Sequence, residues 1–144
     1  MLSVKKILEA KMSCALSSLS PQHTVIDALE LMAEKNIGVV VIMDGDTLAG
    51  IFSERDYARK GIIQGRKAKS TPLTDVMTAH VFTVSPEMSI NDCMNLFSEK
   101  HIRHLPVVEA EKVVGLVSIG DVVKAMLREQ KSHIQFLEQY ISGH

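Results

Sequence analysis

The sequence of 144 residues contains one pattern twice, and this repeat restricts the possible folds most strongly. A shift of 65 positions (85 minus 20) places residues 20–56 over residues 85–121 without a gap. Ten pairs are then identical: Ser20/Ser85, Pro21/Pro86, Asp27/Asp92, Leu31/Leu96, Glu34/Glu99, Lys35/Lys100, Ile37/Ile102, Gly50/Gly115, Ser53/Ser118 and Asp56/Asp121. One copy is too short to bury a full core. We therefore expect two copies of one unit, packed face to face with pseudo-two-fold symmetry.

Each copy begins with a strand and a helix. The strands are expected at 15–19 and 81–84, and each is followed by Ser-Pro, where proline stops a central strand. Thr24 and Ser89 then stand where a hydroxyl caps a helix. Apolar residues at helical spacing follow both caps. The pattern predicts one amphipathic helix in each copy.

A strand hairpin and a second helix complete each copy. Apolar runs at 38–43 and 104–108 are typical of buried strands, and turns at 44–46 and 110–111 lead into return strands. The second copy continues as a long helix over 121–141, whose free apolar face suits dimerisation or packing on the N-terminal helix. We divide the chain into an N-terminal helical segment (1–14), a first repeat (15–62), a linker (63–78), a second repeat (79–130) and a C-terminal helix extension (131–144).

Composition excludes several classes of protein. Hydrophobic residues make up 46% and charged residues 23%, so the chain is not disordered, and a net charge of −1 gives no basic field for nucleic acid. Cys14 and Cys93 lack C-x-x-C spacing and are interpreted as small core side chains. The sequence contains no signal-peptide pattern and no apolar run long enough to span a membrane. We expect a reduced, cytoplasmic protein.

Four segments resemble the motifs of the cystathionine-β-synthase (CBS) domain. They are G-I-F-S-E-R-D at 50–56, G-L-V-S-I-G-D at 115–121, R-H-L-P-V-V at 103–108 and D-V-M-T at 75–78. The resemblance covers about residues 12 to 130. It implies an α/β (α+β) fold in which two pseudo-two-fold-related β-α-β-β-α repeats pack through their sheets as a Bateman module. It also implies two clefts for AMP, ADP, ATP or NAD, with S-adenosylmethionine ranked after these, and a homodimer.

The residues themselves suit a nucleotide. Asp56 and Asp121 stand at helix starts, where a carboxylate offers two acceptor oxygens to a ribose diol. Ser53 and Ser118, three residues earlier, place a hydroxyl near the same turn. Glycines at positions 50 and 115 allow close approach of another backbone.

The resemblance implies the full set of contacts in each cleft. One cleft combines Leu16, Ile37, Gly38 and Val39 with Ser118, Gly120 and Asp121. The other combines Val81, Phe82, Ile102 and Arg103 with Ser53, Arg55 and Asp56. Arg55, Arg103 and His104 are the expected phosphate partners, and the loop residues Lys69, Ser70 and Thr71 are further candidates.

The two copies differ at two motif positions. Val41 replaces the proline found at Pro106, and Arg55 replaces the glycine found at Gly120. These differences leave open whether both clefts bind the same ligand.

Other interpretations stay open. The two aspartates could act only as helix caps. His101 and His104 are a weak metal pair, and no metal site is expected. We favour a regulatory adenine-nucleotide sensor that acts on an unidentified partner protein. The alternatives are an enzyme, for which no nucleophile–base pair is evident, a structural dimer with empty clefts, and a nucleic-acid binder using the basic loop at 66–69.

Overall fold

The computed structural model describes residues 2–11 and 16–142, which form two compact units. The first-repeat unit contains residues 16–83 and the hairpin tip 108–114. The second-repeat unit contains residues 2–11, 84–107 and 115–142. Each unit has its own hydrophobic core.

The first-repeat unit contains a three-stranded sheet. Strand β1 (Ser18–Leu19) lies parallel to β2 (Val39–Asp44), which pairs antiparallel with β3 (Thr47–Ser53). Helix α2 (Val25–Lys35) packs against β2, and its buried residues Val25, Ala28 and Met32 join the core. The first four residues of β2 are all buried, as the continuous apolar run predicts.

The chain after β3 forms short helical segments. Helix α3 (Glu54–Asp56) continues into the π-helix η1 (Tyr57–Ile62), and a 3₁₀ turn η2 (Leu73–Asp75) follows. A Cβ atom on Gly61 would lie 2.9 Å from the Tyr57 ring, so a glycine is needed inside the π-helix turn.

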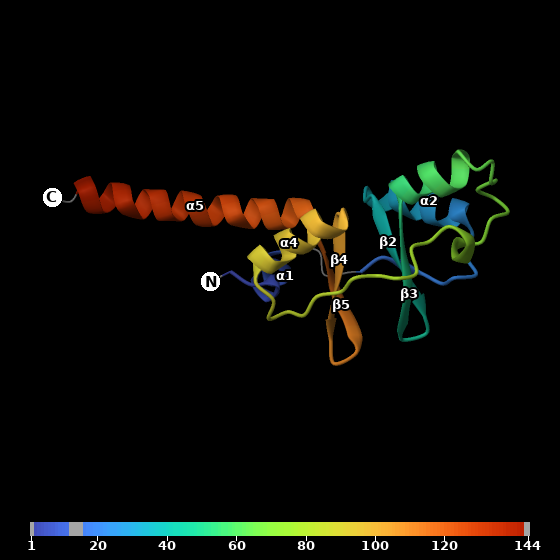
Figure 1. Cartoon of the computed structure of the whole chain (residues 1–144), viewed down its shortest axis with the longest axis horizontal. Coiled ribbons are helices and arrows are strands. Elements are labelled where there is room, and N and C mark those ends of the chain that lie inside the picture. The colour runs from blue at the N-terminus through green and yellow to red at the C-terminus, as the bar shows by residue number, and fades with distance from the viewer. Residues whose placement is uncertain (1, 12–15, 143–144) are drawn as a thin grey trace. The chain divides into compact units, whose positions relative to one another are not determined.

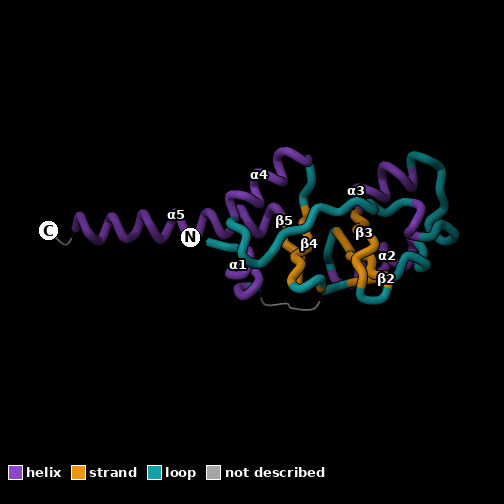
Figure 2. The backbone as a smooth tube through the Cα atoms, turned by 60° about the horizontal axis from the view of Figure 1, so that its bottom comes forward, coloured by secondary structure: helices purple, strands orange, loops and turns teal. Residues whose placement is uncertain are grey.

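The described residues of the second-repeat unit form three helices and most of a hairpin, which can be followed in Figures 1 and 2. They are α1 (Val4–Ala10), α4 (Ile90–Lys100), β4 (His104–Glu109), β5 (Lys112–Ser118) and α5 (Ile119–Ser142). Helices α1 and α4 both contact α5, whose C-terminal half extends beyond them (Figure 1). The long C-terminal helix is therefore confirmed, and it contacts the N-terminal helix, but most of the apolar face predicted for such packing stays exposed.

The predicted helix caps are confirmed in both copies. Thr24 is the N-cap of α2, and its N–H donates to the Asp27 carboxylate at 2.9 Å. Ser89 caps α4 by accepting from the Asp92 N–H at 3.2 Å. Asn36 and His101 end these helices in the left-handed conformation, each with φ of 54°.

The predicted strand at 81–84 is wrong for most of its length. The strand bridge in this segment is at Val84, which lies parallel to Val107 and donates its N–H to the Pro106 carbonyl at 3.0 Å. The bridge cannot extend forward because Pro86 follows and has no N–H. The equivalent first-copy strand is observed at Ser18–Leu19, and its expected first residue, Ala15, lies outside the described residues.

The segment that precedes each repeat packs against the other repeat. Residues 2–10 precede the first repeat but belong to the second-repeat unit, while residues 71–78 precede the second repeat and belong to the first-repeat unit. Four equivalent main-chain hydrogen bonds hold these segments: Val4 N–H to Met88 O (2.9 Å), Lys5 N–H to Pro86 O (2.8 Å), Leu73 N–H to His23 O (2.8 Å) and Thr74 N–H to Pro21 O (3.3 Å). Val4 and Leu73 are fully buried at matching positions in the two cores. The repeat therefore extends to the segments that precede each copy.

Two further predictions concern the cysteines and membrane-spanning segments. Cys93 is buried in the second-repeat core as expected, whereas Cys14 lies outside the described residues. No helix in the described part of the chain is long and apolar enough to cross a membrane.

Candidate ligand-binding site

Two equivalent strand-to-helix turns carry the predicted aspartates. In each copy a serine ends the return strand and caps the following helix, and the aspartate is the third helical residue. The Asp56 N–H donates to Ser53 Oγ at 3.2 Å, and the Asp121 N–H donates to Ser118 Oγ at 3.0 Å. Each carboxylate in turn accepts the serine N–H, at 3.0 Å for Asp56 and 2.9 Å for Asp121. Both aspartates therefore cap a helix as well as being candidates for ligand binding.

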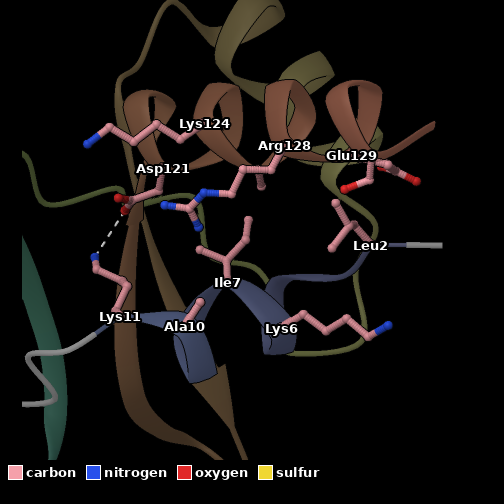
Figure 3. A pocket seen from close by; sticks show the side chains of 11 residues that line it. Leu2, Lys6, Ile7, Ala10, Lys11, Asp121, Lys124, Arg128 and Glu129 are labelled. Carbon is pink, nitrogen blue, oxygen red and sulfur yellow. Dashed lines mark hydrogen bonds and ion pairs between the residues drawn. The ribbon is translucent and has the colours of Figure 1, made fainter. Parts of the chain in front are cut away.

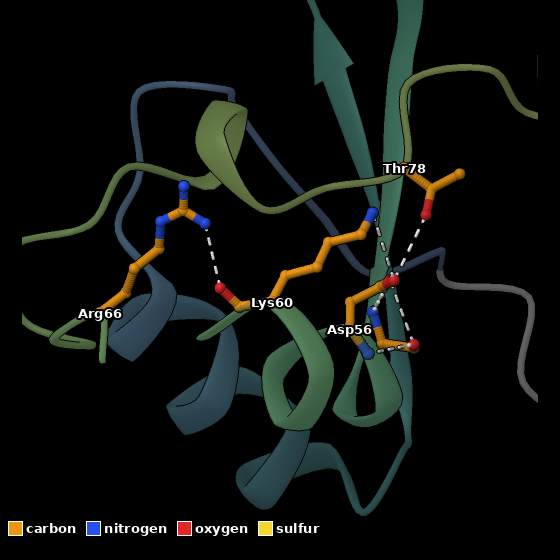
Figure 4. A network of polar contacts seen from close by, with 5 residues as sticks. Asp56, Lys60, Arg66 and Thr78 are labelled. Carbon is orange, nitrogen blue, oxygen red and sulfur yellow. Dashed lines mark hydrogen bonds and ion pairs between the residues drawn. The ribbon is translucent and has the colours of Figure 1, made fainter. Parts of the chain in front are cut away.

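The Asp56 carboxylate uses both of its oxygens within the first-repeat unit (Figure 4). Oδ2 accepts the N–H and the hydroxyl of Ser53, the latter at 3.1 Å. Oδ1 accepts the Thr78 hydroxyl at 3.3 Å and lies 3.8 Å from Lys60 Nζ. A ribose diol would have to compete with these donors for Oδ1.

The Asp121 carboxylate is more open to a ligand (Figure 3). Its Oδ2 accepts the Ser118 N–H and the Lys11 ammonium, which lies 3.0 Å away and also donates to the Leu116 carbonyl at 2.9 Å. No hydrogen bond to Oδ1 is found among residues 2–11 and 16–142. Asp121 therefore keeps one acceptor oxygen for a hydroxyl group.

The ionisation of Asp121 is favoured in the folded chain. Burial acts to raise the pKa of Asp121, but the hydrogen bond from the Ser118 N–H and the Lys11 ammonium outweigh it and lower the pKa below its ordinary value. The carboxylate is therefore charged at neutral pH, as a strong acceptor for a diol must be.

Asp121 opens onto a groove between α1 and α5. The groove has a volume of about 550 Å³, which is in the usual range for small-molecule sites. Ile7, Ala10 and Ala125 supply apolar lining, and Lys11, Lys124 and Arg128 supply positive charge. Figure 3 shows the Arg128 side chain extending toward Asp121. A carboxylate acceptor and several cations thus lie in one groove.

His104 is a neutral group in this unit. Burial is the main cause that lowers the pKa of His104; Asp121 opposes this effect, while Lys11 and Arg103 add to it. With its pKa below the ordinary 6.5, the imidazole is uncharged at neutral pH. His104 therefore offers a phosphate a hydrogen bond and no positive charge, whereas the guanidinium group of Arg103 is exposed.

The other predicted contacts are distributed between the two units. Leu16, Ile37, Gly38, Val39, Ser53, Arg55, Asp56, Val81 and Phe82 belong to the first-repeat unit, and Ile102, Arg103, His104, Ser118, Gly120 and Asp121 belong to the second. Arg55, Gly38, Phe82 and Gly120 are exposed, while Val39 is buried. Each predicted cleft takes residues from both units, so its assembly remains a prediction.

The predicted phosphate loop has a structural role at α2. Thr71 is only 7% exposed, and its carbonyl accepts the N–H of Val25 at 2.9 Å. Lys69 and Ser70 are exposed beside it. The loop is ordered, as expected, because Ile26 and Val25 donate their free helix-start N–H groups to it.

Four polar groups close to the aspartates were not predicted from the sequence: three form a hydrogen bond or an ion pair with an aspartate, and Arg128 lines the groove beside Asp121. Lys60 stands four residues after Asp56, and Arg128 lies seven after Asp121 on the same helix face, so helical spacing could have identified both. Thr78 and Lys11 come from the segments that precede the repeats. Nothing in the local sequence places these two residues beside an aspartate.

A metal site finds no support within the part of the chain that the structure describes. No group of three or more His, Cys, Asp or Glu side chains there is arranged to hold an ion.

Comparison with known proteins gives consistent matches. The protein-family model described as the CBS domain matches residues 4–62 and 73–128. The CBS domain-containing protein CBSX3, mitochondrial, of Arabidopsis thaliana is 43% identical over 125 residues, which cover 83% of this chain and 61% of the plant protein. The chain thus spans less than two thirds of that relative's length.

Solved structures match most of the chain. A CBS-domain structure from Burkholderia ambifaria has a TM-score of 0.86 and 44% identity, with 90% of this chain and 96% of the other covered. The CBS domain pair of MJ0100, solved with 5′-methylthioadenosine and S-adenosyl-L-methionine, has a TM-score of 0.78 and 24% identity, with 89% and 98% covered. At this identity the second match establishes a shared fold.

Proposed function

We propose that this chain, which belongs to the CBS domain family, is a regulatory module that binds an adenosine-containing ligand and passes its occupancy to a partner protein. The module acts as a homodimer in the cytoplasm and catalyses no reaction. Ser118 and Asp121 form the principal site, and Ser53 and Asp56 form a second, weaker site. A ligand can regulate in this way only if it binds two states of the module with different affinity.

The groove beside Asp121 is the observation that carries this proposal. A charged carboxylate with one open oxygen lies in the same groove as Lys11, Lys124 and Arg128. The carboxylate suits a ribose hydroxyl, and the cations suit phosphate. A ligand that contains both groups, such as a nucleotide, satisfies the whole arrangement.

The charges also rank the possible ligands. AMP, ADP, ATP and NAD carry phosphate, which the basic side chains of the groove attract. S-adenosylmethionine carries a positive sulfonium group, which the same cations disfavour. MJ0100 binds S-adenosylmethionine and 5′-methylthioadenosine, so the adenosine part is the shared element and the phosphates would be specific to this chain.

Thermal unfolding with and without each ligand tests the proposal. A ligand at about 100 times its dissociation constant should add about 2.7 kcal/mol, which raises Tm by roughly 5–10 °C for a domain of this size. Asp121→Asn keeps an oxygen for the Ser118 N–H but loses the charge, so we expect this variant to lose most of the shift. Asp56→Asn should lose less of it, because Thr78 and Lys60 already engage that carboxylate.

Asp27→Asn is the matched control. Asp27 closes the same kind of capping box on Thr24, at 2.9 Å, but lies outside both predicted sites. The control variant should be less stable than the native chain and yet show the full ligand shift. If none of the adenosine ligands shifted the Tm, the proposal would be contradicted and a structural dimer would be favoured. The exposed apolar face of α5 is the observation that supports such a dimer. Conversion of the added nucleotide to a product would instead indicate an enzyme.

A further inference from the structure

The C-terminal part of α5 is helical but covered by nothing in its own unit. Every residue from 127 to 142 is exposed. Leu127, Ile134 and Ile141 are 60%, 54% and 74% exposed, which is unusual for large apolar side chains on a soluble chain. A helix end of this length is marginal on its own in water, because helices gain most of their stability from packing.

Five of the exposed apolar residues of α5, together with Gln130, follow a coiled-coil repeat. Val123, Leu127, Gln130, Ile134, Leu137 and Ile141 are separated alternately by four and three residues. This is the spacing of the a and d positions of a heptad, which together form one seam along a helix. The seam adjoins the α4 side of α5, where Gln130 and Ile134 line a pocket with Ile90 of α4, and no seam residue lines the groove on the α1 side. Its apolar side chains nevertheless remain 39% to 74% exposed.

We propose that this seam pairs with the α5 helix of a second copy in antiparallel orientation. In the pairing that covers the most apolar surface, Leu127 faces Leu137 of the second copy and Val123 faces its Ile141. Two-fold symmetry repeats both contacts, so that one seam covers the other along its full length. The helix of 24 residues is about 36 Å long, and nearly all of it takes part.

Charge along the edge of the seam fits this orientation. Lys124 and Glu138 occupy equivalent edge positions, two heptads apart, and the antiparallel arrangement brings each beside the other residue of the second copy. In a parallel pair these two charges would lie far apart. Two contacts in this arrangement are less favourable: Lys131 meets its own counterpart at the centre, and the polar Gln130 faces Ile134 of the second copy.

A notch beside the seam is placed to receive the far end of the second helix. It has a volume of about 420 Å³ and lies between the start of α4 and α5, where Ile90, Met126 and Ile134 line it. The proposed register brings Tyr140 of the second copy beside Met126. The apolar seam and the notch are therefore both covered by the α5 helix of the second copy in the same antiparallel register.

Sedimentation equilibrium of the full chain tests the pairing. Leu127→Glu should weaken dimerisation by roughly a hundredfold or more, because symmetry places two unfavourable contacts in each dimer. Phe136→Glu is the control: Phe136 is 63% exposed on the same helix but lies off the seam, so the dimer should persist. A native chain that is monomeric throughout, or equal weakening by both variants, would overturn the proposal.

Exchange of the edge charges tests the orientation. Lys124→Glu should weaken the dimer about fivefold through two surface ion pairs, and the added Glu138→Lys should restore it. If the double variant Lys124→Glu/Glu138→Lys did not regain the dimer affinity of the native chain, the antiparallel register would be overturned. Circular dichroism confirms that each variant folds. The nucleotide shift of Leu127→Glu, measured separately, shows whether ligand binding is retained when the dimer is lost.

Discussion

At the scale of single residues, the two aspartates show how one sequence signal can have two outcomes. The same Ser-x-x-Asp spacing builds the same capping geometry in both copies. The difference comes from outside the repeat: Thr78 and Lys60 occupy Oδ1 of Asp56, while Lys11 pairs with Oδ2 of Asp121. Equivalent residues in a repeat therefore need not have equivalent affinity for a ligand.

His104 should make the free energy of unfolding depend on pH. Its pKa is lowered in the folded chain, chiefly by burial, so below about pH 6.5 the unfolded chain takes up a proton more readily than the folded one. The contribution of His104 to the free energy of unfolding is therefore fully present above about pH 6.5. As the pH decreases below this value, the free energy of unfolding falls by at most about 1.4 kcal/mol per pH unit, until the pH is below the folded-state pKa. Urea unfolding between pH 5 and 7.5 should show a weaker dependence for His104→Gln.

His80→Gln serves as the control for this measurement, because His80 is exposed. It should follow the pH dependence of the native chain. If the free energy of unfolding depended on pH equally in the native chain and in His104→Gln, His104 would not be the group responsible.

At the scale of elements, local signals placed the helices and hairpins but not every strand. Hydroxyl caps, apolar spacing and turn residues each act within a few positions, and the helix starts after Thr24 and Ser89 follow from them. The region 81–84 resembles a strand locally, yet a strand exists only where a neighbour pairs with it. The sequence could therefore predict the repeat unit, while the extent of its shortest strands depends on distant partners.

The return strands should respond differently to an added methyl group. A Cβ at Gly50 would lie 2.7 Å from the Thr78 carbonyl oxygen, and Thr78 is fixed to Ile51 by two main-chain hydrogen bonds of 2.9 and 3.0 Å. A Cβ at Gly115 would lie 2.7 Å from Leu8 Cδ2, the end of a flexible side chain. Gly50→Ala should thus cost roughly 1–3 kcal/mol in chemical unfolding, and Gly115→Ala clearly less.

Equal losses in the two variants would show that the Thr78 backbone can move aside as easily as the Leu8 side chain. The comparison is well matched because both glycines occupy the same position of the repeat.

At the scale of the whole molecule, the exchange of preceding segments is the feature that the sequence alone did not reveal. An alignment of residues 20–56 with 85–121 identifies the repeat and both aspartates, but it says nothing about which unit receives residues 2–11 or 71–78. Those segments supply Lys11 and Thr78 to the two sites. The sequence therefore predicted the half of each site that lies within a repeat, and contacts over long sequence separation determine the rest.

Val4 and Leu73 are the fully buried residues of the two preceding segments, and truncation of each should destabilise a different unit. Val4→Ala removes a fully buried side chain from the second-repeat core, so hydrogen exchange should accelerate more in α4 than in α2. Leu73→Ala, at the matching position of the first-repeat core, should give the reverse pattern. Each substitution should cost roughly 1–4 kcal/mol. Acceleration confined to α2 in Val4→Ala would contradict the exchanged arrangement.

The exchange also sets an order for synthesis on the ribosome. Apart from the hairpin tip, the first-repeat unit is one continuous stretch, whereas the second-repeat unit is split and its first piece is made long before the rest. At ordinary elongation rates of about 5–20 residues per second, residues 2–11 wait several seconds for α4 and α5 to emerge. Val4 and Ile7, which end in the second-repeat core, stay uncovered during that interval. The nascent chain thus exposes helix α1 to chaperones and to other nascent chains until α4 and α5 have been made.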